Sequence, residues 1–173
     1  MRNVAFLIIH TKKYEKFNNE EIRSNRGSVN IPLMLMINRW DGKIGFPGGN
    51  INENETIKDG LLREVREEIS LTLVLNQISK IEEFTFQDKK VHLFVIQTDH
   101  DSMKEIIRNS TYCDSFLKEN QGCFAVQMTD FNDENLKHVN YFRTAYTGAD
   151  AIYLYVINTG DGSEVTYLYR VDP

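Results

Sequence analysis

A short stretch of this chain, REVREEIS at residues 63–70, places three glutamates within about one helical turn. Apolar residues recur around it at spacings of three and four, which predicts an amphipathic helix over residues 56–69. The expected apolar face consists of Leu61, Leu62, Val65 and Ile69. Glu64, Glu67 and Glu68 form a separate stripe, where like charges repel by about 0.2–0.5 kcal/mol per pair. A solvated helix face laced with ion pairs would explain this stripe, and so would a bound cation.

The turn before the predicted helix favours the cation. Residues 45–52 read GFPGGNIN, and glycine permits the backbone angles that a close approach to a ligand requires. Mg²⁺ takes oxygen ligands, and proteins hold it with a few carboxylates plus the phosphates of a substrate. A divalent cation would also relieve the repulsion among the three glutamates. The stretch therefore predicts a site for a metal ion and a phosphate group.

Length and composition set the broad class of protein. The 173 residues fit one domain, which we expect to span residues 1–173. Hydrophobic residues make up 41% and charged residues 26%, which is typical of a globular chain and excludes disorder over most of it. The formal net charge of −5 argues against a broad basic surface for nucleic acid. An acidic protein that handles phosphates would need metal ions as the counter-charge.

Two features bear on location. Cys113 and Cys123 are too few for a disulfide framework, and they indicate reduced intracellular thiols rather than a zinc site. The apolar run at the N-terminus ends at His10, so it is too short to span a membrane, and it lacks a cleavage site. We therefore expect a soluble, cytoplasmic protein without a membrane partner.

The remaining sequence mixes strand and helix signals without a regular alternation, which favours an α/β or α+β fold with a mixed sheet. Strands are predicted at residues 4–10, 31–40, 82–86, 91–98, 123–129 and 163–171. The Asp-Gly pair at 41–42 predicts a hairpin turn, and residues 11–30 predict a long exposed loop. Residues 102–120 predict a helix at least in part, with a break near 109–111. Residues 147–158 fit either helix or strand, and Gly148 and Asp150 favour a helix in the first half.

From residue 49 to residue 71 the sequence reads G-x5-E-x7-R-E-V-x-E-E-x-S-L. This pattern resembles the box of the Nudix family, G-x5-E-x7-R-E-U-x-E-E-x-G-U, in which U is an aliphatic residue. The one departure is Ser70, where the family usually has glycine. Glycine at such a place ends a helix in the left-handed conformation, so serine either accepts the cost of that conformation or ends the helix differently. No carboxylate is lost, and we expect activity.

The resemblance implies a Nudix fold, which is an α/β/α sandwich with a mixed β-sheet. It also implies metal-dependent hydrolysis of a nucleoside diphosphate linked to another moiety, with Mg²⁺ or Mn²⁺ as cofactor. The implied metal ligands are Glu64, Glu67, Glu68 and the backbone carbonyl of Gly48. Arg63 would orient a carboxylate, Glu55 would brace the loop, and Gly49 would lie beside the ligand. The general base would be a carboxylate of the box or one of Glu119, Asp133 and Glu134.

A narrower resemblance covers residues 33–68. It is similar to the Nudix branch that includes the nuclear snoRNA-decapping enzymes, which also cleave inosine diphosphate and triphosphate. Arg39 would contact phosphate or base and Phe46 would lie beside the ligand, although a solvated arginine and a core aromatic explain them equally well. That branch has a histidine against the purine base on its first strand, and the corresponding place here is Val4. The resemblance alone therefore does not fix the base.

Several functions follow from these observations. The first is cleavage of purine nucleoside di- and triphosphates, inosine nucleotides before others, to a nucleoside monophosphate. RNA decapping is an alternative against which the acidic charge weighs, and ADP-ribose or dinucleotide cleavage is another. A nucleotide-sensing module that does not cleave its ligand is the non-enzyme alternative, but such modules usually lose carboxylates that this chain retains. A homodimer would fit the apolar C-terminal stretch.

Overall fold

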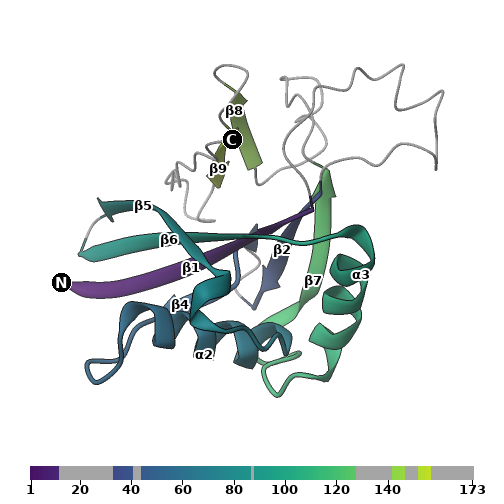
Figure 1. Cartoon of the computed structure of the whole chain (residues 1–173), viewed down its shortest axis with the longest axis horizontal. Helices are drawn as coiled ribbons and strands as arrows, with labels where there is room; N and C mark the ends of the chain where they lie inside the picture. The colour runs from purple at the N-terminus through teal and green to yellow at the C-terminus, as the bar shows by residue number, and fades with distance from the viewer. Residues whose placement is uncertain (12–32, 41–43, 87, 128–141, 147–151, 157–173) are drawn as a thin grey trace.

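The main sheet is mixed. The computed structural model describes residues 1–11, 33–40, 44–86, 88–127, 142–146 and 152–156. Within these ranges, one seven-stranded sheet has the order β3-β2-β1-β6-β5, with β4 beside β1 and β7 beside β2 (Figure 1). Its strands are β1 (Arg2–His10), β2 (Leu33–Arg39), β3 (Ile44–Gly45), β4 (Gly48–Asn50), β5 (Ser79–Phe86), β6 (Lys89–Gln97) and β7 (Asn120–Gln127). A second sheet pairs β8 (Phe142–Tyr146) with β9 (Ile152–Val156).

Strand β1 is the centre of the main sheet. It runs parallel to β6 along its whole length, from the pair Arg2 and Lys89 to the pair His10 and Gln97. Its pairings with β2 and β4 are antiparallel. Because β1 is buried on both faces, apolar residues occupy consecutive positions rather than alternate ones. This arrangement confirms the predicted α/β fold with a mixed sheet.

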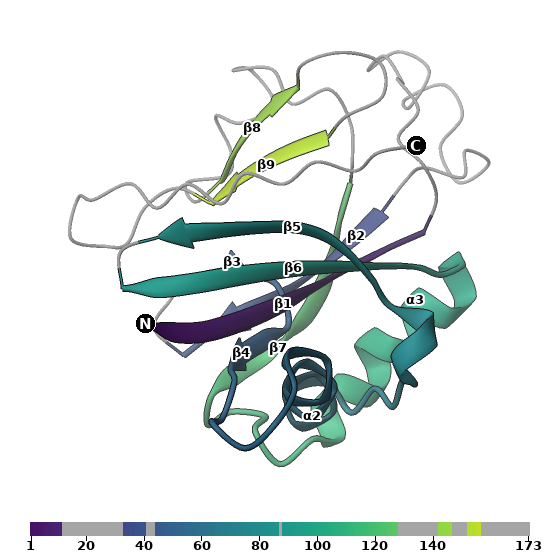
Figure 2. The ribbon, with the colours of Figure 1, turned by 60° about the vertical axis from the view of Figure 1, so that its left-hand side comes forward.

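Both described helices cover one face of this sheet. These are α2 (Ile57–Ile69) and α3 (His100–Asn109), which Figure 2 shows below the sheet, with β8 and β9 on its other side. Their buried side chains join the odd-numbered apolar residues of β1 in one core cluster: Ala5, Leu7, Ile9, Leu61, Val65, Ile69, Met103 and Ile106. The opposite face carries a second cluster of Val4, Ile8, Met34, Met36, Phe46, Val91 and Leu93. None of the helices in the described ranges is long and apolar enough to cross a lipid bilayer.

Most of the predicted elements are confirmed. Strands β1, β2, β5, β6 and β7 fall where strands were predicted, and β5 and β6 form the predicted antiparallel hairpin. The helix predicted for part of residues 102–120 is confirmed as α3, which ends at the predicted break near 109–111. After α3, the chain forms a short 3-10 helix, η2 (Ser110–Tyr112), and then a turn in which Leu117 has a φ of 63°.

Other predictions fall partly or wholly outside the described residues. These concern the exposed loop from residue 12 onward, the turn at 41–42 and the strand at 163–171. Within 147–158, where helix was favoured for the first half, the described residues Ile152–Val156 form strand β9. The helix proposed for the first half lies at residues that the structure does not describe.

Candidate active site

The predicted metal-binding helix, α2, has defined ends. Thr56 is its N-cap, and its hydroxyl oxygen accepts a hydrogen bond from the main-chain N–H of Asp59 at 3.2 Å. Ser70 is its C-cap in the left-handed conformation, with φ 56° and ψ 25°. The Ser70 N–H donates to the carbonyl of Arg66 at 3.0 Å. Serine therefore adopts the conformation for which the family pattern has glycine.

Arg63 ties the loop before α2 to the helix. Its Nη2 and Nε donate to the two carboxylate oxygens of Glu55, at 2.7 and 3.1 Å. Glu55 also accepts the main-chain N–H of Asn52 at 2.7 Å, and Arg63 reaches the carbonyl of Asn50 at 3.1 Å. The hydrogen bonds from Arg63, followed by that from Asn52, lower the pKa of Glu55 to about 2. Glu55 is thus a charged brace, as the resemblance implied.

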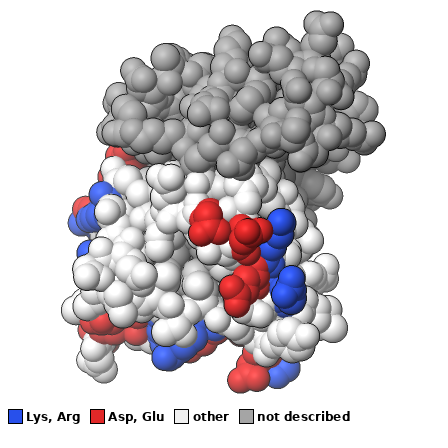
Figure 3. Space-filling model, turned by 45° about the vertical axis from the view of Figure 1, so that its right-hand side comes forward, with Lys and Arg blue, Asp and Glu red and all other residues white. Residues whose placement is uncertain are grey.

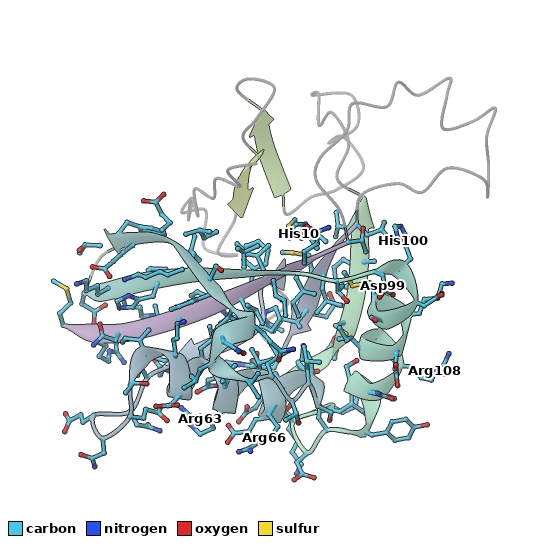
Figure 4. The ribbon with its side chains drawn as sticks, in the orientation of Figure 1. His10, Arg63, Arg66, Asp99, His100 and Arg108 are labelled. Atoms are coloured by element: carbon cyan, nitrogen blue, oxygen red, sulfur yellow. The ribbon has the colours of Figure 1, made fainter. Side chains whose placement is uncertain are left out.

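The same guanidinium group holds two of the three glutamates. Arg63 Nη1 donates to Glu64 Oε1 at 2.9 Å and to Glu67 Oε2 at 3.1 Å. Figure 4 shows Arg63 and Arg66 projecting from α2 on the side away from the sheet. The hydrogen bonds of Arg63 are to carboxylates and one carbonyl, which supports an orienting role for this residue.

Two glycines bring the β4 backbone against the carboxylates. The main-chain N–H of Gly48 donates to Glu68 Oε2 at 2.8 Å, and Gly48 has a φ of +136°. A Cβ atom at Gly48 would lie 2.1 Å from the carbonyl oxygen of Ala5, and one at Gly49 would lie 2.6 Å from Glu64 Oε2. Glycine at position 48 avoids a clash with the backbone of β1, and glycine at position 49 leaves room for the Glu64 carboxylate.

Burial raises the pKa values of two of the three α2 carboxylates. Burial raises the pKa of Glu68 to about 8, against the opposing effect of the Gly48 N–H. The charges of Glu64 and Glu119 raise the pKa of Glu68 further, and that of Arg39 lowers it. Burial also raises the pKa of Glu64, although Arg63 opposes the effect. The charge of Glu119, one of the three candidate bases outside the box, contributes to raising the pKa of both carboxylates.

The carboxylates of Glu64, Glu67 and Glu68 suit a hard divalent cation in their donor atoms and in their charge. In the part of the chain that the structure describes, no three acidic, histidine or cysteine side chains already converge as a metal cage. Burial nevertheless raises the pKa of the Glu68 carboxylate despite the charge of Arg39, and a divalent cation would offset that cost of burial. The carboxylates of Glu64 and Glu67 lie on the same side of α2, where Arg63 contacts both. Oxygen donors in such an acidic patch are the ligands that Mg²⁺ and Mn²⁺ prefer.

The two predicted ligand contacts outside the box differ in their surroundings. Arg39, at the end of β2, lies close enough to Glu68 for its charge to lower the pKa of that residue. Phe46 is 5% exposed and packs with Val4 and Met36 in the cluster on the sheet face away from α2. A contact between Phe46 and a ligand stays a prediction, and its position agrees with the alternative of a core aromatic.

A groove adjoins the acidic patch. It has a volume of about 560 Å³ and is lined by Arg66, Glu67, Ser70, Tyr112, Cys113, Asp114, Ser115, Lys118 and Glu119. Tyr112, one of the residues that line this groove, is 80% exposed. On the face drawn in Figure 3, acidic and basic side chains lie side by side, and the described residues show no broad basic surface there.

Sequence reasoning missed the turn at residues 113–120, which touches the end of α2. Cys113, Ser115 and Asn120 donate hydrogen bonds to main-chain carbonyls of that helix. Only the break predicted near residue 109 hinted at this turn. The other candidate bases, Asp133 and Glu134, lie outside the described residues.

Comparisons with known proteins bear on the family and the fold. The profile of the Nudt16-like family, described as U8 snoRNA-decapping enzyme-like, matches residues 4–154. The U8 snoRNA-decapping enzyme of Xenopus laevis is 35% identical over 49 residues, which are 28% of this chain and 23% of that enzyme. A MutT/nudix family protein from Enterococcus faecalis superposes with a TM-score of 0.50 at 13% identity, over 91% of this chain and 52% of that chain. A mutT/nudix family protein from Listeria innocua gives a TM-score of 0.46 at 20% identity, over 79% and 82% of the two chains.

The fold and the acidic patch on α2 together define a Nudix protein. The chain belongs to the Nudt16-like family, whose profile covers most of its length. The Enterococcus faecalis structure, at its low identity, bears on the fold alone, and it agrees with the Nudix fold. The chain matches less than a quarter of the Xenopus laevis enzyme and about half of the Enterococcus faecalis protein.

Proposed function

We propose that this chain is a divalent-metal-dependent hydrolase that cleaves the diphosphate linkage of purine nucleoside di- and triphosphates. Inosine nucleotides are the first candidates, with IMP as product. Nudix proteins act on phosphoric anhydride bonds of nucleotides, and this chain keeps every carboxylate of the box. The observation that carries the proposal is the stripe of Glu64, Glu67 and Glu68 packed against the Gly48–Gly49 backbone.

Each residue of the patch has a role in this proposal. Glu64, Glu67, Glu68 and the carbonyl of Gly48 would hold Mg²⁺ or Mn²⁺. The ion, when bound, supplies positive charge that neutralises the phosphate oxygens during the transfer. Arg63 orients Glu64 and Glu67 through the contacts of its Nη1 atom. Arg39 supplies a further positive charge beside Glu68.

We propose Glu119 as the general base. Its charge acts on Glu64 and Glu68, and it lines the same groove as Glu67. In the proposed step, Glu119 accepts a proton from a water molecule whose oxygen bonds to the α-phosphorus. The bond from that phosphorus to the bridging oxygen breaks, so IDP yields IMP and phosphate, and ITP yields IMP and pyrophosphate. Arg66 and Lys118 in the groove would face the departing group.

The experiment is a panel of substrates with Mg²⁺ and with Mn²⁺, with products identified by mass. It includes IDP, ITP, GTP, dGTP, ADP-ribose, dinucleotide polyphosphates and capped RNA. Glu67→Gln removes one charge from the metal site at nearly constant shape, and Glu105→Gln on α3 makes the same change at an exposed position away from it. We expect IMP from wild type and from Glu105→Gln, and a loss of at least 100-fold with Glu67→Gln. Absence of cleavage across the panel would refute the proposal, and would leave nucleotide sensing without cleavage as the remaining function.

RNA decapping is the second candidate because a curated relative in the family is a U8 snoRNA-decapping enzyme. The net charge of −5 weighs against it, since a phosphate backbone attracts basic surfaces. Capped RNA as the best substrate, with activity that falls steeply as salt rises, would support decapping over IDP hydrolysis.

The proposal has three further parts: a single domain over residues 1–173, a cytoplasmic location and a homodimer. Size-exclusion chromatography with light scattering tests the homodimer.

A further inference from the structure

The turn at residues 113–120 caps the C-terminal end of α2 with side chains. Ser115 Oγ donates to the main-chain carbonyl of Glu67 at 2.7 Å. Asn120 Nδ2 donates to the carbonyl of Glu68 at 3.0 Å, and Cys113 Sγ reaches the same oxygen at 2.9 Å. The last carbonyls of a helix lack intrahelical partners, so these donors supply what the helix cannot. The capped residues are two of the three glutamates of the proposed metal site.

The turn is also fixed within itself. The carbonyl of Ser115 accepts the N–H groups of Lys118, Glu119 and Asn120, at 3.0, 2.9 and 3.3 Å. Asn120 is 1% exposed, and its Nδ2 also donates to Ser115 Oγ at 2.9 Å. Leu117 adopts a left-handed φ of 63° while its side chain stays 73% exposed. A non-glycine residue in that conformation costs about 1–2 kcal/mol, so the surrounding hydrogen bonds must hold the turn in this shape.

Glu119 is the residue that this turn places. Its carbonyl accepts the main-chain N–H of Trp40 at 3.1 Å, and the next residue, Asn120, pairs with Arg39 where β7 meets β2. The main chain around Glu119 is therefore tied to α2 on one side and to β2 on the other. Glu119 lines the same groove as Glu67, which belongs to the helix that the turn caps.

We propose that Ser115 and Asn120 are positioning residues that fix Glu119 relative to the carboxylates of α2. They are 7% and 1% exposed, and they act through the main chain of Glu67 and Glu68. The inference rests on the proposed function, in which Glu119 accepts the proton of the attacking water. A shift of about 1 Å in such a group can lower the rate on the order of 100-fold, so loss of one hydrogen bond should affect kcat before KM.

The test compares two buried serines that cap different helices. Ser115→Ala removes the donor to Glu67 of α2, and Ser110→Ala removes a donor to the carbonyl of Ile107 of α3, which is also 2.7 Å long. We expect both variants to lose similar stability, but only Ser115→Ala to lower kcat, by about tenfold or more, at nearly unchanged KM. Mn²⁺ binding measured by electron paramagnetic resonance should stay within twofold of wild type in both, because the carboxylates of the box remain.

A third variant, Asn120→Asp, keeps the shape but replaces two N–H donors with an acceptor beside the Glu68 carbonyl. It should lower kcat at least as much as Ser115→Ala. Equal loss of kcat in Ser110→Ala and Ser115→Ala, or wild-type kcat in Ser115→Ala, would overturn the positioning role. If wild type cleaves nothing, the proposed function fails separately. Amide hydrogen exchange then tests the positioning role without activity. The role requires faster exchange at the amides of Glu119 and Asn120 in Ser115→Ala, and unchanged exchange at these amides in Ser110→Ala.

Discussion

The guanidinium group of Arg63 forms two hydrogen bonds with the carboxylate of Glu55, at 2.7 and 3.1 Å. The two residues are eight positions apart, one in the loop before α2 and the other in its second turn. The third nitrogen, Nη1, faces Glu64 and Glu67. The planar fork of arginine can make both sets of contacts at once, so one side chain fixes the loop and orients two carboxylates.

Arg63→Lys should therefore lower kcat although it keeps the charge. An ammonium group cannot make the paired contact with Glu55 and also reach Glu64 and Glu67. We expect a 10- to 100-fold lower kcat with a small change in KM. This corresponds to a loss of about 1.4–2.7 kcal/mol of transition-state stabilisation. Steady-state kinetics with Mn²⁺ measure it. Arg108→Lys, at an exposed position of α3, is the matched control, and equal kcat in the two variants would contradict the role of Arg63.

Metal binding should strengthen as pH rises from 6 to 8. Burial raises the pKa of Glu68 to about 8 without metal, so at pH 6 an ion must displace a proton from it. The apparent Kd for Mn²⁺ should fall with pH, by no more than tenfold per unit for one proton, and level off above about 8. Isothermal titration calorimetry in buffers of different ionisation enthalpy measures the proton release. In Glu68→Gln this pH dependence should become shallower, and an unchanged slope would contradict the assignment.

The same group links folding to pH in the metal-free protein. Its folded pKa is raised above the unfolded value near 4.5, so the folded state holds the proton more tightly. The stabilising contribution is complete below about pH 4.5 and is lost as pH rises through about 8. Saturating Mg²⁺ should therefore raise the melting temperature more at pH 8 than at pH 6. Thermal unfolding at both pH values checks this, and a larger shift at pH 6 would contradict it.

Local patterns in the sequence were enough to predict α2. Its apolar spacing and its stripe of glutamates lie within one short stretch of the chain, where side-chain periodicity acts directly. The mixed sheet also followed from local strand signals and the absence of regular alternation. Glu55 and Arg63 could be assigned as brace and orienter only through the resemblance, because residue spacing alone does not say which carboxylate an arginine meets.

The turn that caps α2 could not be predicted in this way. Its side chains reach carbonyls 45 to 52 residues earlier in the chain, and no local pattern reports such contacts. Leu117 adopts a left-handed conformation that leucine disfavours, so the sequence gives no reason to expect a left-handed residue there. The place of Glu119 in the same groove as Glu67 depends on the same long-range packing. Sequence reasoning could name Glu119 as a candidate but could not choose it.

Ser70→Gly should stabilise the protein. Ser70 ends α2 with a φ of 56°, a conformation that glycine adopts without the steric cost that a Cβ atom brings. We expect a gain of about 1 kcal/mol in the free energy of unfolding, or a melting temperature about 2–4 °C higher, measured by calorimetry. Ser79→Gly in strand β5 should instead destabilise, because that position needs no left-handed backbone. A Ser70→Gly variant less stable than wild type would show that its side chain has another role.

Adjacent glycines should respond differently to the same added methyl group. At Gly49 the new Cβ atom would lie 2.6 Å from Glu64 Oε2, the end of a flexible side chain that can move aside. Gly49→Ala should therefore fold with a melting temperature close to wild type but lower kcat by 10-fold or more, since Glu64 leaves its place. At Gly48 the atom would lie 2.1 Å from the main-chain oxygen of Ala5, with φ at +136°, so Gly48→Ala should fold poorly. Thermal unfolding and kinetics of the two variants separate these effects, and wild-type kcat in a well-folded Gly49→Ala would exclude Glu64 from the reaction.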